Sequence, residues 1–141
     1  MYRRGVISAY MHFVGSTAAA PLLRVADTGG GRAVAAAISA KLFRIASPPD
    51  AIMTSSSIFA AGVLDAALKA SIAVPEELMI ATMTDGPLAE FAEVPITGLR
   101  IDTHRSAEAV LDLLNKNLRG NSYPIENQRI DLQLIKRRST R

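Results

Sequence analysis

Apolar and polar residues alternate with two different periods along the chain, and the changes of period mark the expected elements. Residues 32–45 carry Val34, Ile38 and Leu42 at the spacing of one helix face. Residues 51–54 form a short apolar run, which is typical of a buried parallel strand. The pattern therefore predicts a helix followed by a strand.

This order repeats towards the C-terminus. Residues 58–70 again have helical spacing, and residues 78–83 and 95–101 are strand candidates. A strongly periodic helix is predicted from residue 102 or 103 to about 118, and Gly120 is suited to end it. Residues 130–134 alternate as a half-exposed strand. Alternating helices and strands indicate an α/β fold, with a mostly parallel sheet flanked by helices.

The first thirty residues give weaker signals. Residues 4–13 have roughly helical spacing, and residues 22–26 are a short strand candidate. Gly29, Gly30 and Gly31 follow at a spacing that matches neither the dinucleotide fingerprint nor the P-loop, so we interpret them as a flexible turn.

Small polar residues close two of the predicted strands. Ser55, Ser56 and Ser57 follow the strand at 51–54, and Thr84 and Asp85 follow the next one. In open α/β sheets, ligands bind in the crevice beyond the carboxyl ends of the strands. We therefore expect hydroxyls and one carboxylate to meet at a single rim, where the serines also cap the following helix.

The composition fits a packed domain, or a piece of a larger one. Of the 141 residues, 49% are hydrophobic and 21% are charged, which argues against disorder. Only 5% are aromatic, so the core must be mostly aliphatic, which favours helices packed on a sheet over an aromatic-rich β-sandwich. The net charge of +3 gathers at the two ends, without a helix-turn-helix pattern beside it. No apolar run approaches the ~20 residues that span a bilayer, and the N-terminus is a poor signal peptide. We expect a soluble cytoplasmic protein with no membrane partner.

The residue types that carry catalysis or bind metals are sparse. Cysteine is absent, and neither His12 nor His104 has acidic partners at metal-ligand spacing. A Ser-His-Asp set could be drawn from Ser56, His104 and Asp85, but the chain has no Gly-x-Ser-x-Gly elbow to expose the serine. We therefore expect no enzyme, no metal site and no cofactor.

Seven segments in succession resemble the effector-binding region of LacI/GalR-family bacterial transcription regulators. Together they span roughly residues 30–140. The segments are Pro49-Asp50-Ala51-Ile52, the helix from Ile58 to Leu68 with Gly62, Val74-Pro75-Glu76-Glu77-Leu78, Asp85-Gly86-Pro87-Leu88-Ala89, Pro95-Ile96-Thr97, the helix that ends near Gly120, and Leu134-Ile135-Lys136-Arg137-Arg138-Ser139-Thr140.

The resemblance implies an incomplete periplasmic-binding-protein-like fold of type I. Residues 1–101 would form the C-terminal subdomain without its first strand, and residues 102–128 a portion of the N-terminal subdomain. Residues 129–141 would return as the final strand. The family's helix-turn-helix is absent from this chain, so operator DNA would be a partner only through a segment that the chain lacks.

The resemblance also implies a ligand site, in which this sequence departs from the family. The matching positions are Ser56, Ser57, Thr84, Asp85 and Ile101. Most of them replace the amides and carboxylates that hold sugar hydroxyls. A site built for sugar hydroxyls rejects ligands that lack them, and this site is built differently. We therefore expect a smaller or less polar effector than a plain hexose.

Assembly and function follow from the same resemblance. A homodimer is expected, because two DNA-binding heads on a palindromic site require a two-fold axis. The resemblance places its interface at Phe59, Leu64 and Leu88. The function implied is effector sensing and dimerisation in a LacI-type regulator. The alternative is an exported, monomeric solute-binding receptor of a transport system with the same fold.

Overall fold

A four-stranded sheet with helices on one face forms the body of the molecule. The computed structural model describes residues 31–118 and 129–141. The predicted helix at 4–13, the strand at 22–26 and the role of Gly120 as a helix stop lie outside these residues. Within them, the predicted order of helices and strands is confirmed.

The first half of the described chain is a helix-strand-helix-strand unit. Its elements are α2 (Arg32–Leu42), β1 (Ala51–Thr54), α3 (Ser57–Lys69) and β2 (Met79–Thr82). Helix α3 begins where predicted, because the Oγ of Ser56 accepts a hydrogen bond from the Ile58 amide at 3.3 Å. Helix α2 ends three residues before the predicted residue 45, since the chain turns ahead of Pro48 and Pro49.

The second half contains the short helix α4 (Pro87–Glu90), β3 (Thr97–Ile101), α5 (Thr103–Leu118) and β4 (Leu132–Ile135). Strands β1, β2 and β3 are parallel neighbours in that order, and β4 pairs antiparallel with β3. The last strand pair brings Ile101 opposite Leu132, next to the start of α5. The sheet is therefore mostly parallel, as predicted.

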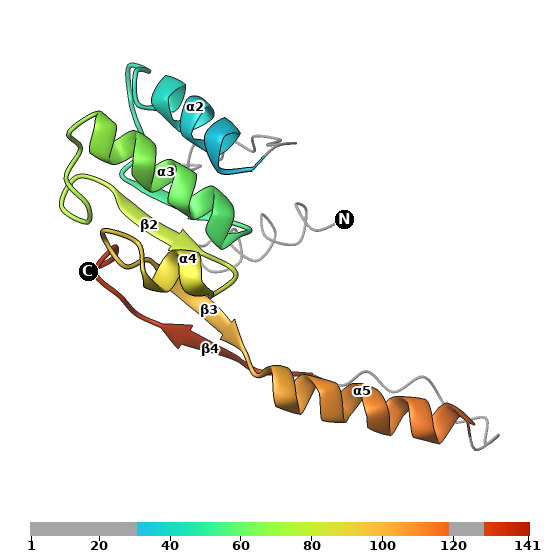
Figure 1. Cartoon of the computed structure of the whole chain (residues 1–141). Coiled ribbons are helices and arrows are strands. Elements are labelled where there is room, and N and C mark those ends of the chain that lie inside the picture. Colours follow the sequence, from blue (N-terminus) through green and yellow to red (C-terminus); the bar gives the residue numbers. More distant parts are fainter. Residues whose placement is uncertain (1–30, 119–128) are drawn as a thin grey trace, which may run out of the picture.

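The core lies between α3, α4 and the sheet. Helices α3 and α4 cover one face of the strands, and α2 packs against α3 (Figure 1). The buried cluster is almost entirely aliphatic, as the low aromatic content predicts. It consists of Ala60, Val63, Leu64, Ala67, Leu78, Ile80, Ala89 and Ile96.

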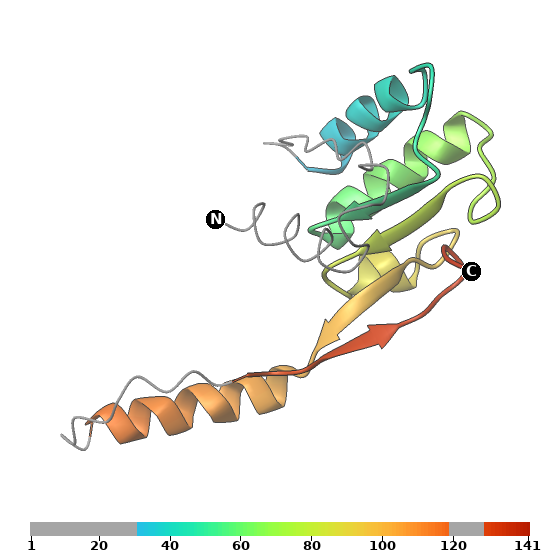
Figure 2. The same ribbon diagram turned by 180° about the vertical axis from the view of Figure 1, so that it is seen from behind.

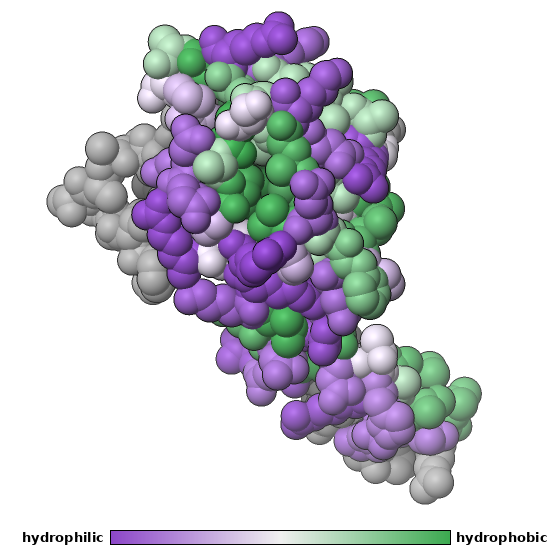
Figure 3. Space-filling view, turned by 60° about the vertical axis from the view of Figure 1, so that its left-hand side comes forward, coloured by the Kyte–Doolittle hydropathy of each residue, from purple (hydrophilic) through white to green (hydrophobic). Residues whose placement is uncertain are grey.

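Helix α5 extends away from this body. It leaves the sheet at the end of β3, and both ribbon views show it projecting beyond the packed layers (Figures 1 and 2). Val110, Leu111 and Leu114 on it are each more than half exposed. In the space-filling view the projecting part displays hydrophobic and hydrophilic side chains together (Figure 3). None of the helices in the described ranges is both long and apolar enough to cross a bilayer.

Candidate functional site

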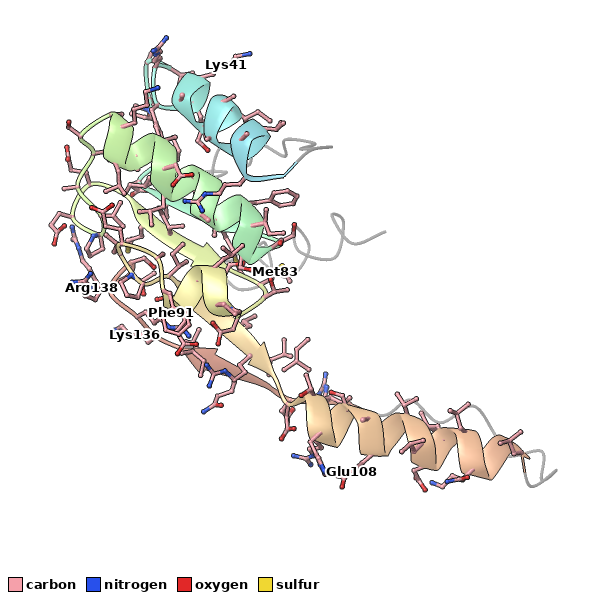
Figure 4. All side chains as sticks on the ribbon, in the orientation of Figure 1. Lys41, Met83, Phe91, Glu108, Lys136 and Arg138 are labelled. Carbon is pink, nitrogen blue, oxygen red and sulfur yellow. The ribbon has the colours of Figure 1, made fainter. Side chains whose placement is uncertain are left out.

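The carboxyl ends of the three parallel strands form a polar rim, which we define as residues 55–57, 83–85 and 100–101. Parallel pairing places these three segments at the same edge of the sheet. Backbone bonds join them, since the Met83 amide donates to Thr54 O at 2.8 Å and the Asp85 amide donates to Leu99 O at 2.8 Å. Figure 4 shows Met83 at the end of β2, near the first turn of α3.

Three predicted ligand residues come together at the rim. The Oγ1 of Thr84 accepts a hydrogen bond from the Ser57 amide at 3.2 Å, and Ser56 caps the same helix turn. Each of these two hydroxyl oxygens therefore accepts a backbone N–H, and its own proton is left to donate. Ser56, Ser57 and Thr84 thus form one contiguous hydroxyl cluster across β1 and β2.

The carboxylate of Asp85 is already occupied by two arginines. Arg137 Nη1 lies 2.7 Å from Oδ1, and Arg100 approaches Oδ2 with Nη2 at 2.7 Å and Nε at 2.9 Å. The side chain of Asp85 is only 4% exposed. The hydrogen bond from Arg137 is the largest cause that lowers the pKa of Asp85 to about 2, against the opposing effect of burial. Asp85 is therefore a buried anion that holds two cations.

The C-terminal segment completes this arrangement, which sequence reasoning missed. Arg137 Nη1 also donates to Ile96 O at 2.8 Å, and the Arg137 amide donates to Thr97 Oγ1 at 2.9 Å. The buried Ser139 Oγ donates to Ile80 O at 2.5 Å and accepts from the Thr97 amide at 2.9 Å. The chain end is thus hydrogen-bonded to both β2 and β3 behind Asp85.

The remaining predicted ligand residue, Ile101, lies at the far end of the rim. It is the last residue of β3 and is 47% exposed. The Asp85 amide reaches Leu99, two residues before it, so Ile101 adjoins the arginine side of the rim. The structure does not bring it into a described contact with the hydroxyl cluster.

The Ser-His-Asp set considered from the sequence is not assembled. Ser56 caps α3, and Asp85 is paired with arginines. The side chain of His104 is 85% exposed on α5, with Glu108 at 3.4 Å. Within the described ranges, no three His, Asp or Glu side chains gather in a way that could hold a metal ion.

A hollow of about 300 Å³ lies away from the rim, near the amino ends of β1 and β2. Its lining is mostly apolar and includes Phe43, Ile72 and Leu78. None of the predicted ligand residues lines it, so the rim remains the candidate site.

Comparison with known proteins supplies the family. The sequence profile of the periplasmic binding protein-like domain matches residues 2–140, which is nearly the whole chain. The chain belongs to this family. Within it, the chain is an effector-binding region of the LacI family of transcriptional regulators.

Repressors and a regulator structure are among the similar proteins. The lactose operon repressor of Rhizobium radiobacter is 31% identical over 75 residues, which are 53% of this chain and 66% of that protein. The repressor CytR of Escherichia coli K12 is 28% identical over 101 residues, covering 72% of this chain and 30% of CytR. A LacI-family regulator from Lactobacillus casei, solved with bound sucrose, superposes with a TM-score of 0.71 at 26% identity, over 98% of this chain and 50% of that one. The chain thus spans only part of each of these proteins.

The prediction that Leu64 lies at the subunit interface of this LacI-family region needs correction. The side chain of Leu64 is 3% exposed and packs in the core cluster of its own chain, so it is not available to a partner subunit. The prediction for Leu64 was wrong because the helical spacing of residues 58–70 does not show which side chains of α3 meet the sheet. Phe59 is half-buried, whereas Leu88 on α4 is 42% exposed.

The structure also adds an exposed aromatic residue that the sequence prediction omitted. Phe91, which caps the C-terminal end of α4, is 79% exposed (Figure 4). Phe91 follows Leu88 by three residues, so the two exposed apolar side chains are also close in sequence.

Proposed function

We propose that this chain is the effector-sensing part of a LacI-type transcriptional regulator and that its rim binds a small molecule. The observation that carries the proposal is the hydroxyl cluster of Ser56, Ser57 and Thr84 at the carboxyl ends of parallel strands. The family relationship to repressors supports regulation over transport, which was the alternative.

We further propose that the ligand lies in a cleft between two subdomains, with residues 102–128 belonging to the second one. The exposed apolar stripe of α5 supports this, because contiguous exposed apolar surface marks a face that another element covers (Figure 3). Ligand binding would then shift the balance between two arrangements of the subdomains. The size of that shift equals the difference in ligand affinity between them.

The ligand proposal is tested by binding to the rim. A panel of sugars, nucleosides and small acids would be screened by thermal shift, and each compound that binds would be measured by titration calorimetry. In Thr84→Val the rim loses its hydroxyl at nearly constant volume, so affinity should fall by about tenfold. Ser47→Ala, in an exposed loop, is the matched control. Equal affinity of Thr84→Val and wild type would refute binding at this rim.

For assembly, we propose a homodimer that uses the exposed side of α4 with Leu88 and Phe91. Both side chains are apolar and exposed, and α4 packs against α3, which carries the half-buried Phe59. DNA contact would require a helix-turn-helix supplied elsewhere.

Sedimentation equilibrium tests this interface. Phe91→Glu should convert a dimer to a monomer, because a charge at the centre of an apolar contact is left unpaired. Leu134→Glu is the matched control, since Leu134 is an exposed leucine on β4, which is an edge strand of the sheet. A dimer that survives Phe91→Glu but is lost in Leu134→Glu would refute the proposed interface at α4 and place the subunit contact at β4.

A further inference from the structure

The polar side chains that line the rim are mainly hydrogen-bond donors. The oxygens of Ser56 and Thr84 already accept backbone amides, so each hydroxyl proton remains available to donate. The rim carboxylate, Asp85, is 4% exposed and accepts from arginine at both oxygens. The acceptor that could have held the hydroxyl groups of a neutral sugar is therefore occupied from inside the protein.

The two arginines are unequally supplied with carboxylate partners. Both guanidinium groups share the carboxylate of Asp85. Glu90 lies 4.0 Å from Arg137 Nη2, but it has no described contact with Arg100. Arg137 therefore has two carboxylates within 4.0 Å, whereas Arg100 has only the one that it shares.

Arg100 is also the accessible member of the pair. Its side chain is 49% exposed, against 11% for Arg137. Its Nε and Nη2 both face Asp85, and its Nη1 has no hydrogen-bond partner within residues 31–118 and 129–141. Asp85 thus fixes the orientation of a guanidinium that still has donors to offer, and planar guanidinium groups bind carboxylates and phosphates in pairs of bonds.

The neighbouring helix adds to this preference without supplying free donors. Helix α3 has 13 residues and no acidic residue in its first turn, so the positive end of its dipole is uncompensated at the rim. Its first amides are satisfied by Thr84 and Ser56. Only the dipole and the hydroxyl protons therefore act on a ligand.

From these observations we infer that the effector is a small acid, carrying a carboxylate or phosphate group that Arg100 binds while the serine and threonine hydroxyls donate to its other oxygens. The inference rests on the proposed function and specifies its ligand class. It also changes the expectation drawn from the hydroxyls alone, which favoured a less polar ligand. The sequence could not show that two arginines converge on Asp85.

The test uses inorganic phosphate first and then a matched pair, glucose and glucose 6-phosphate, all at one ionic strength. Phosphate and the sugar phosphate should raise the melting temperature of the wild-type chain, and glucose should not. In Arg100→Gln the affinity measured by calorimetry should fall by about tenfold or more, because a charged hydrogen-bonding group is lost. Arg100→Lys keeps the charge but not the planar pair of donors, so it should retain only part of the affinity. Lys69→Gln, which removes an exposed charge from the opposite end of α3, should bind like wild type.

Three results would overturn the inference. One is phosphate binding that is unchanged in Arg100→Gln, and another is the absence of any effect of phosphate or sugar phosphate on the wild-type chain. The third is equal stabilisation by glucose and by its phosphate, which would leave effector binding at the rim intact and refute only the acid preference. The comparison of the two sugars requires no variant, so it decides the point even if Arg100→Gln unfolds.

Discussion

Replacing Asp85 by asparagine is the sharpest test of the arginine arrangement. The substitution keeps the size of the side chain and removes its charge. Arg137, which is 11% exposed, then loses its carboxylate partner, and so does Arg100. We expect the chain to fold and to lose stability at neutral pH, since a largely buried cation is left without its counter-ion.

The magnitude follows from the pKa of the carboxyl group. Arg137 and then Arg100 lower the pKa of Asp85 from its ordinary value of 3.8 to about 2, although burial opposes them. At about 1.4 kcal/mol per pH unit, this corresponds to roughly 2.5 kcal/mol of stabilisation. Stranding Arg137 adds to the cost, so the loss of unfolding free energy should lie between about 2 and 4 kcal/mol at pH 7.

The pH dependence has a definite sign. A carboxyl group whose pKa is lower in the folded state stabilises the fold above its ordinary pKa of 3.8, and this stabilisation is lost as the pH falls through about 2. The difference between wild type and Asp85→Asn should therefore be constant above about pH 5 and fall to roughly half its linkage part at pH 3.

Urea unfolding followed by circular dichroism at pH 7, 5 and 3 measures these differences. Asp50→Asn, at an exposed position before β1, should change stability by no more than about 0.5 kcal/mol. The reasoning is refuted if Asp85→Asn matches wild type at pH 7. It is equally refuted if a difference at pH 7 persists undiminished at pH 3.

Three further substitutions test the packing around the site. In Gly62→Ala the added methyl group would lie 2.8 Å from Ala35 Cβ and against the Arg32 carbonyl, so the α2–α3 contact must open. Thermal unfolding should show that the unfolding free energy falls by about 1 to 3 kcal/mol. Ser139→Ala removes the partner of a buried amide and a buried carbonyl, and a loss of about 1 to 3 kcal/mol in urea unfolding is expected. Leu64→Glu should unfold the chain by circular dichroism, whereas Leu68→Glu, at a position 36% exposed, should not; a folded Leu64→Glu protein would contradict the core assignment.

The elements of the fold were predictable because their signals are local. The helical spacing of residues 58–70 and the serines before them specify both the existence and the start of α3. The four-residue helix α4 was not among the predicted helices, since one turn contains no periodicity. Its start at Gly86-Pro87 is nevertheless a local signal, because proline is favoured in the first turn of a helix.

The candidate site was only partly predictable, because half of it depends on contacts that are distant in sequence. The hydroxyls follow their strands directly, so their convergence could be expected from the order of strands. Asp85, by contrast, meets Arg137 across 52 residues and Arg100 across 15. Nothing in the local pattern distinguishes Arg137 from the other basic residues near the chain end, or marks Arg100 as a partner of Asp85. Asp85 was therefore predicted to contact the ligand, whereas in the structure its carboxylate pairs with two arginines of the same chain.

The position of Arg100 has a consequence for how the rim could communicate with the rest of a regulator. Arg100 is the second-last residue of β3, and α5 begins three residues later. The loop that carries Thr84 and Asp85 is bound to β3 twice, through the Asp85 amide to Leu99 O and through the carboxylate to Arg100. A ligand that binds Thr84 and Arg100 together must therefore favour one spacing between this loop and the end of β3. Because that end leads directly into α5, the same preference acts on the orientation of α5, and its strength is limited by the difference in ligand affinity between the two spacings.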